Sequence, residues 1–136
     1  MGNSRHVEVV KELYGAFQKA DVDALLQLLT DDVVFTIPEM PGVPLGTSYQ
    51  GKQGVTQFLM DRVPVIRYTA FDPQRYFSDQ ETVLVLGETA GVVLKTGRTF
   101  RYKWVQLFEF APNGLIQRFH EFLDTSVLVR AFAGQG

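Results

Sequence analysis

Cysteine is absent from this sequence, and histidine occurs only twice, as His6 and His120. Without cysteine there is no disulfide, no thiolate-bound metal and no cysteine nucleophile, which fits a reducing compartment. The histidines are far apart, and neither belongs to a His-x-His or Glu-x-x-His pair, so we expect no metal site. We expect His6 to be exposed near the terminus and His120 to lie on an outer face.

Clusters of basic residues and long apolar segments are also missing. The net charge is −2, from 13 Lys and Arg against 15 Asp and Glu, and nucleic-acid binding needs clustered cations. No segment approaches the roughly 20 apolar residues of a membrane span, and the first residues contain no apolar signal core. We therefore expect a soluble, cytoplasmic protein without nucleic-acid or membrane partners, which leaves small molecules and proteins.

The first half of the chain has the periodicity of helices. Apolar residues recur at helical spacing over about residues 5–19, and Asp21 would cap a second helix that ends near 30–32. The β-branched and aromatic segment 33–37 predicts a strand. Another helical pattern covers 55–63.

Three features of this half carry further expectations. The segment 38–51 is apolar and rich in proline and glycine, which predicts an irregular loop of the kind that often serves as a lid. Gly15 lies in a helix interior, where glycine is unfavourable, so we expect it to permit the close approach of another element. Asp31 and Asp32 are interpreted as a solvated turn.

The second half of the chain reads as strands. Runs rich in Val, Leu, Phe, Tyr and Trp cover 66–77, 82–94, 99–110 and 115–123, separated by short polar turns that favour antiparallel hairpins. A terminal helix is predicted over 125–132, capped by Thr125.

Helices followed by long antiparallel strands predict an α+β domain with the helices on one face of the sheet. Strands this long should twist and curl around the helices, which gives a cone. This order, the spacing from the opening helix through Asp31-Asp32-Val33, and the closing Gly-Leu-Ile-Gln-Arg-Phe-His-Glu-Phe-Leu-Asp-Thr resemble the nuclear transport factor 2-like superfamily, also called ketosteroid isomerase-like or SnoaL-like. The resemblance covers about residues 6–133. It implies a single domain, 1–136, with a curled mixed, mainly antiparallel sheet wrapped around the N-terminal helices.

The strongest candidate for chemistry is Glu121. Period-2 alternation in the last predicted strand places Leu115, Gln117, Phe119, Glu121 and Leu123 on one face. If that face lines the interior, Glu121 is a pocket acid with a raised pKa, able to act as a general acid or base.

An aromatic wall is predicted on the neighbouring strand, where Phe100, Tyr102, Trp104, Gln106, Phe108 and Phe110 share one face. An apolar pocket with few polar groups and a simple aromatic core explain this pattern equally well. We predict the following ligand-binding residues: Phe35, Ile37, Met40, Phe58, Thr89, Trp104, Gln106, Phe108 and Phe119.

The resemblance also supplies comparisons with two known reactions. In the steroid isomerases a tyrosine of the first helix stabilises the oxyanion, which makes Tyr14 a second catalytic candidate. The isomerase base, however, would fall near Ile37 and its second acid near Gln106, which argues against that mechanism. In limonene-epoxide hydrolases an acid that corresponds to Glu121 works with partner residues, which in this sequence would fall near Gly87 and Thr89. The neighbouring Glu88 would point inward only if the strand contained a bulge.

Two functions therefore stay open. One is a cofactor-free isomerase, cyclase or hydrolase that acts on a small, largely apolar organic molecule through Glu121. The other is a non-catalytic ligand-binding or protein-interaction module of the same fold. In either case we expect a homodimer through the outer sheet face, with Val105, Leu107, Ile116 and Phe122 as its apolar part.

Overall fold

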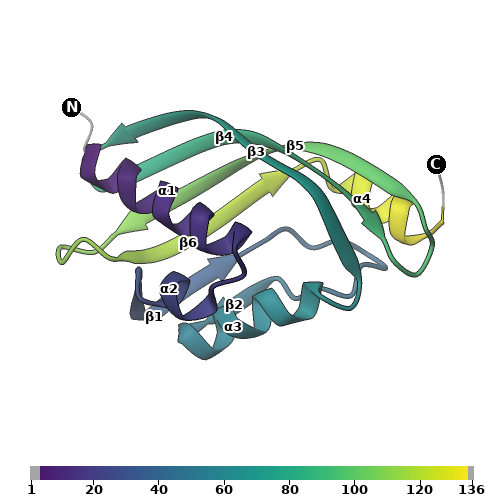
Figure 1. Ribbon diagram of the computed structural model, residues 1–136, viewed down its shortest axis with the longest axis horizontal. Coiled ribbons are helices and arrows are strands. Elements are labelled where there is room, and N and C mark those ends of the chain that lie inside the picture. The colour runs from purple at the N-terminus through teal and green to yellow at the C-terminus, as the bar shows by residue number, and fades with distance from the viewer. Residues whose placement is uncertain (1–3, 135–136) are drawn as a thin grey trace.

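The computed structural model describes residues 4–134, which form four helices and one mixed sheet of six strands (Figure 1). In chain order the elements are α1 (Ser4–Gln18), α2 (Val22–Leu26), β1 (Leu29–Thr36), β2 (Ser48–Gln50), α3 (Gly51–Arg62), β3 (Ile66–Asp79), β4 (Thr82–Val93), β5 (Thr99–Phe110), β6 (Ile116–Leu123) and α4 (Thr125–Phe132).

The sheet has the order β2-β1-β6-β5-β4-β3. Strands β3 to β6 form an antiparallel meander, and β1 pairs in parallel with β6, so the mixed, mainly antiparallel sheet is confirmed. The long strand β3 has two register shifts against β4, which let it bend. Helix α1 lies along the β3 and β4 side of the curled sheet and α3 along the β1 and β2 side, and the core fills the space between them (Figure 1).

The interior face of β5 is the predicted one. Phe100, Tyr102, Trp104, Gln106, Phe108 and Phe110 are all buried, while the residues between them are exposed or half-buried. The regular alternation works here because β5 is a central strand that pairs with both neighbours over most of its length.

The alternation predicted for β6 is wrong at its start. Phe110 pairs with Ile116 but Glu109 pairs with Arg118, so Gln117 is an extra, bulged residue. The bulge turns Ile116 into the core and leaves Gln117 exposed, the reverse of the prediction. Beyond the bulge Phe119 and Glu121 are buried as predicted. Ile116 is fully buried and so cannot belong to an outer apolar surface.

Several helices and strands begin or end at residues other than the predicted ones. The second helix ends at Leu26, because β1 begins at Leu29 and takes up Asp31 and Asp32 as exposed strand residues. The predicted loop contains the short strand β2, which pairs with β1. Helix α4 is capped by Asp124, whose carboxylate accepts from the Ser126 backbone N–H at 3.1 Å, and Thr125 is already helical.

His6 is buried rather than exposed. Its ring stacks on Phe110 with centroids 4.0 Å apart, and Nδ1 lies 3.1 Å from the Gln80 carbonyl oxygen. These contacts attach the start of α1 to the β3–β4 hairpin and to β5. His120 is half-buried and stacks on the exposed ring of Phe122, consistent with the predicted outer position.

Glycine permits close packing at Gly87, not at Gly15. A Cβ added at Gly15 would meet nothing within 4 Å, so no element approaches it closely and that expectation is wrong. At Gly87, on the inner face of β4, an added Cβ would collide with the Trp104 ring and lie 2.7 Å from the Asp72 carbonyl oxygen. The ring of Trp104 therefore occupies the space that a side chain at position 87 would need.

These two glycines predict opposite effects of the same substitution. Gly15→Ala should stabilise the protein by about 0.5–1 kcal/mol, because alanine favours the helix and meets no obstacle. Gly87→Ala should destabilise it by about 1–3 kcal/mol through overpacking against Trp104. Urea unfolding of the two variants and the wild type checks both signs, and a destabilised Gly15→Ala would contradict the open space at that site.

Candidate functional site

A partly open cavity of about 60 Å³ lies between the helices and the inner face of the sheet, and we call it the inner cavity. Its walls are mostly apolar and aromatic, with few polar groups, as in small-molecule sites. It is lined by Leu13, Tyr14, Phe17, Leu25, Phe35, Phe58, Leu59, Arg62, Tyr68, Phe71, Thr89, Tyr102, Gln106, Phe119 and Glu121.

A larger cavity of about 380 Å³, here the outer cavity, adjoins it. The outer cavity is bounded by the end of α1, by α2, by the end of α3 and by the start of β3. Both cavities share the lining residues Phe17, Leu25, Leu59, Arg62, Tyr68 and Phe71. The outer cavity is large enough for the body of a small organic molecule, and the inner cavity admits only a small group.

A chain of hydrogen bonds joins α1 to the inner cavity. The Tyr14 hydroxyl donates to Gln106 Oε1 at 2.7 Å, and Gln106 Nε2 donates to Glu121 Oε2 at 2.8 Å. The sheet produces the second bond directly, because Gln106 on β5 and Glu121 on β6 are paired across the strands with both side chains inward. The amide of Gln106 is thereby oriented at both ends.

Burial dominates the electrostatics of this chain. Desolvation raises the pKa of Glu121, and the hydrogen bond from Gln106 and the positive charge of Arg62 only partly oppose it. Burial likewise raises the pKa of Tyr14, with smaller contributions from Tyr76 and Glu121, so its phenol stays protonated and remains a donor. The wall of the inner cavity therefore carries a buried carboxyl group whose pKa is raised.

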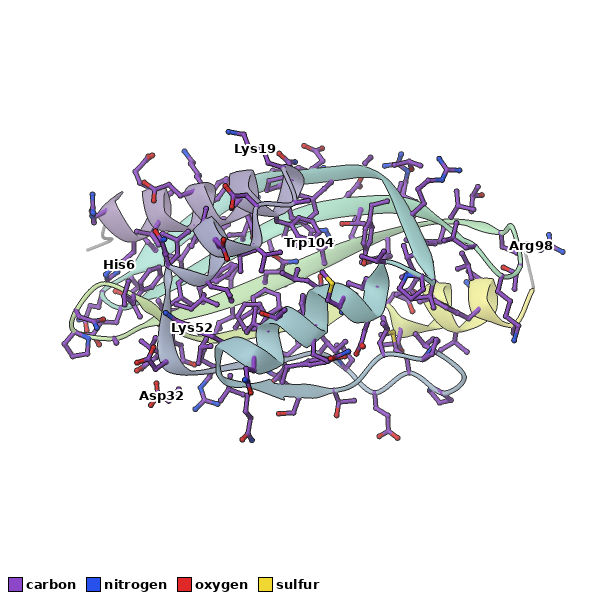
Figure 2. The ribbon with its side chains drawn as sticks, turned by 60° about the horizontal axis from the view of Figure 1, so that its bottom comes forward. His6, Lys19, Asp32, Lys52, Arg98 and Trp104 are labelled. Atoms are coloured by element: carbon purple, nitrogen blue, oxygen red, sulfur yellow. The ribbon has the colours of Figure 1, made fainter. Side chains whose placement is uncertain are left out.

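A second polar contact is structural. Trp104 Nε1 donates to Thr89 Oγ1 at 2.7 Å, and the indole stacks on Phe71 with centroids 5.3 Å apart. Trp104 lies in the interior of the molecule (Figure 2). Its side chain fixes the wall of the site through Thr89 and Phe71, which line the inner cavity.

The structure divides the predicted site residues into two groups. Those that line the inner cavity are Tyr14, Phe35, Phe58, Thr89, Gln106, Phe119 and Glu121. The others, Ile37, Met40, Trp104 and Phe108, are buried but line neither cavity. No residue of the predicted lid segment, 38–51, lines either cavity; the outer cavity is bounded by α1, α2, α3 and β3 instead.

Glu88 does not reach the inner cavity. It lies on the outer face of β4, where its carboxylate is 3.4 Å from Arg101 Nη1, and the β4–β5 pairing runs without a register shift. Among residues 4–134, Glu121 is the only one with a carboxylate side chain that lines the inner cavity.

Sequence reasoning missed Arg62. This residue is 8% exposed and lines both cavities. Its Nη1 donates to the Phe58 carbonyl oxygen at 2.7 Å, and its guanidinium carbon lies 3.7 Å from the centre of the Phe58 ring. Because Phe58 and Arg62 are four residues apart on one helix, the helical pattern of α3 could have indicated this pairing.

The part of the chain that the structure describes contains no group of three or more metal-ligating side chains. None of the helices in residues 4–134 has the length and apolar character needed to cross a membrane.

The sequence model of the SnoaL-like domain family matches residues 10–119 of the chain. The chain belongs to this SnoaL-like domain family. No curated protein sequence matches it. The family assignment agrees with the cone of helices and curled sheet, and it shows that the fold expected from the sequence is correct.

Solved structures show the same architecture in relatives of this SnoaL-like chain. An NTF2-like protein from Burkholderia xenovorans LB400 is 26% identical, with a TM-score of 0.85 over 97% of this chain and 98% of that one. An NTF2-like protein of unknown function from Burkholderia pseudomallei K96243 is 27% identical, with a TM-score of 0.84 over 96% and 98%. TerC, co-crystallised with polyporic acid, is 22% identical, with a TM-score of 0.81 over 95% and 98%, and shows the fold alone.

The raised pKa of Glu121 predicts a distinctive pH dependence of stability. A carboxyl group whose pKa in the folded state lies above its ordinary value of 4.5 destabilises the fold when it ionises, so this penalty is absent below about pH 4.5 and grows as pH rises through the folded-state pKa. Glu121→Gln removes the penalty, so its stability relative to wild type should increase from pH 4 to pH 8 in urea unfolding. Glu88→Gln on the outer face is the matched control, and a Glu121→Gln difference that does not change with pH would refute the raised pKa.

Proposed function

We propose that this SnoaL-like protein binds a compact, largely apolar organic molecule in the two cavities and uses Glu121 to transfer a proton without a cofactor. The observation that carries this proposal is the position of Glu121: a buried carboxylate on the wall of an apolar cavity, hydrogen-bonded to Gln106. A charged group is expensive to desolvate, so a carboxylate kept in this setting calls for a function.

The proposed step is proton abstraction next to a carbonyl group. A C–H bond of the ligand breaks as an O–H bond forms on Glu121, and the electron pair moves onto the carbonyl oxygen to give an enolate. Return of the proton at another carbon completes an isomerisation, and attack of the enolate on a second carbonyl closes a ring. A hydrolysis would use the same carboxylate to take a proton from water.

Gln106 and Tyr14 act as positioning residues in this proposal. The amide of Gln106 holds Glu121 in one orientation, and Tyr14 holds Gln106. The Tyr14 hydroxyl has one hydrogen, and that hydrogen is donated to Gln106. The direct oxyanion role that the family resemblance implied for Tyr14 would require this bond to be exchanged for one to the ligand.

One observation favours the alternative, a non-catalytic binding protein of the same fold. Tyr14, Gln106 and Glu121 satisfy one another, as polar groups do in a purely structural network. Such a protein would bind its ligand without moving a proton, and so the two functions are separated by a measurement of proton exchange.

Deuterium exchange into a ketone tests the proton transfer without knowledge of the natural product. The probe is 2-tetralone in D2O, followed by proton NMR. Wild-type protein should accelerate loss of the C1 protons, Glu121→Gln should reduce the accelerated rate by about 10²–10⁴-fold, and Tyr14→Phe should reduce it less.

Glu88→Gln is the control, because it removes a carboxylate of the outer face and leaves the cavities unchanged. Exchange that persists in Glu121→Gln would remove this residue from the mechanism. Binding of 2-tetralone by wild-type protein without accelerated exchange would favour the non-catalytic alternative.

We also infer a homodimer through the outer face of β5 and β6. Phe122 is 46% exposed there, beside the half-buried Val105 and Leu107. An ion pair of Arg118 and Glu109, 3.9 Å apart, lies on the same two strands. An apolar centre with a charged surround is the usual anatomy of an interface.

Phe122→Glu should convert the dimer to a monomer in sedimentation velocity, because it places a charge at the centre of the proposed interface. Phe77→Glu is the matched control, since Phe77 is 44% exposed but lies near the end of β3. A Phe122→Glu protein that sediments like wild type would place the interface elsewhere or show that the protein is monomeric.

A further inference from the structure

Arg62 is a buried cation with no carboxylate partner among residues 4–134. It is 8% exposed, and arginine is seldom buried to that extent unless it is paired. Within residues 4–134, none of the ion pairs closer than 4.0 Å involves Arg62. Its charge is therefore not neutralised by direct contact with an acidic side chain in this part of the chain.

The known contacts of Arg62 leave much of the guanidinium available. One of its five N–H groups is donated to the Phe58 carbonyl oxygen, and the Tyr68 hydroxyl interacts with it. Stacking on the Phe58 ring holds the guanidinium plane and restricts its rotamers. A planar, fixed fork of donors is the geometry that binds a carboxylate with two parallel hydrogen bonds.

The position of Arg62 between the two cavities also bears on what the cavities can bind. It is one of the residues common to both cavities, so its side chain lies where the outer cavity meets the inner one. Glu121 also lines the inner cavity but forms no ion pair with Arg62. The two opposite charges therefore share one cavity wall without contact, and a ligand can reach both.

The other acidic residue that lines these cavities is Asp21, in the wall of the outer cavity. Its Oδ1 accepts from the Ala24 backbone N–H at 3.1 Å and caps α2. It forms no ion pair with Arg62 within 4.0 Å, so the outer cavity also leaves the guanidinium unneutralised.

We propose that Arg62 binds the anionic group of the ligand, and that the ligand is a small organic acid: a carboxylate or acidic enol on an apolar ring body. This inference rests on the proposed function of the two cavities and deepens it by naming the chemical class of the ligand. The anionic group pairs with Arg62 at the junction, the ring body lies against the apolar wall of the outer cavity formed by Phe17, Leu25 and Phe71, and the reacting carbon points toward Glu121.

The bond from Arg62 to Phe58 suggests a second role, which is to cap the end of α3. A capping role alone makes no distinction between charged and neutral ligands. The experiment therefore compares two ligands of the same shape that differ in charge.

The probes are 2-naphthoate and 2-naphthamide, titrated into the protein at pH 7.5 by isothermal calorimetry. Wild-type protein should bind the carboxylate at least about tenfold more tightly than the amide, as expected for a charge-assisted, two-bond contact. Arg62→Met should abolish this preference and change the amide affinity less than about threefold, because methionine retains the apolar stem. Arg62→Lys should keep part of the preference, since it keeps the charge and loses the planar fork.

Equal affinities for the two probes in wild-type protein, or a preference for the amide, would overturn the role of Arg62 and leave the binding cavity intact. A loss of affinity for both probes in Arg62→Met would show a structural role and also overturn it. If Arg62→Met does not fold, the preference of wild-type protein for the carboxylate and its reduction in Arg62→Lys decide whether Arg62 binds the anionic group. If neither probe binds wild-type protein, the proposed binding of a ligand in the cavities is contradicted as well. If Glu121→Gln leaves the deuterium exchange unchanged, only the proposed proton transfer is contradicted, and the binding result stands.

Discussion

The site depends on the register between β5 and β6, which pairs Gln106 with Glu121 on the inner face of the sheet. This pairing places the Gln106 amide where it donates a hydrogen bond to the buried Glu121 carboxylate, and the oxygen of the same amide accepts a hydrogen bond from the Tyr14 hydroxyl of α1. A slip of one residue would turn Glu121 to the outer face and break its bond to Gln106. Helix and sheet are thus joined by a polar link through an otherwise apolar interior.

The apolar interior explains why a few polar groups are enough for the proposed chemistry. Aromatic rings line much of the inner cavity, and charges in such an apolar setting are poorly screened from one another. Burial raises the pKa of Glu121, while Arg62 at the junction of the cavities opposes that rise. An anion on Arg62 would weaken this opposition, so ligand binding and the basicity of Glu121 are coupled in the proposed mechanism.

The sequence comes close to the structure where a single period governs a whole element. Every inward residue of β5 follows from alternation, and so does the inward position of Glu121. The errors lie where tertiary pairing interrupts a period. The bulge at Gln117 reverses the faces of β6 at its start, and pairing of Leu29 with Ile116 on β6 extends β1 back into the predicted second helix.

Sequence patterns alone determined the α+β class, the curled meander and the presence of one acid on the inner face, because each depends on local periodicity and on apolar residues that must be buried. They left open whether the aromatic residues enclose a space or fill it. Only the tertiary structure decided which of the inward residues of β5 border the inner cavity, namely Tyr102 and Gln106, and which are packed away from it, namely Trp104 and Phe108. This depends on how side chains from several distant elements pack against one another. The same is true of Arg62: its burial beside the cavities depends on how α3 meets α1 and β3, and no pattern within one helix contains that information.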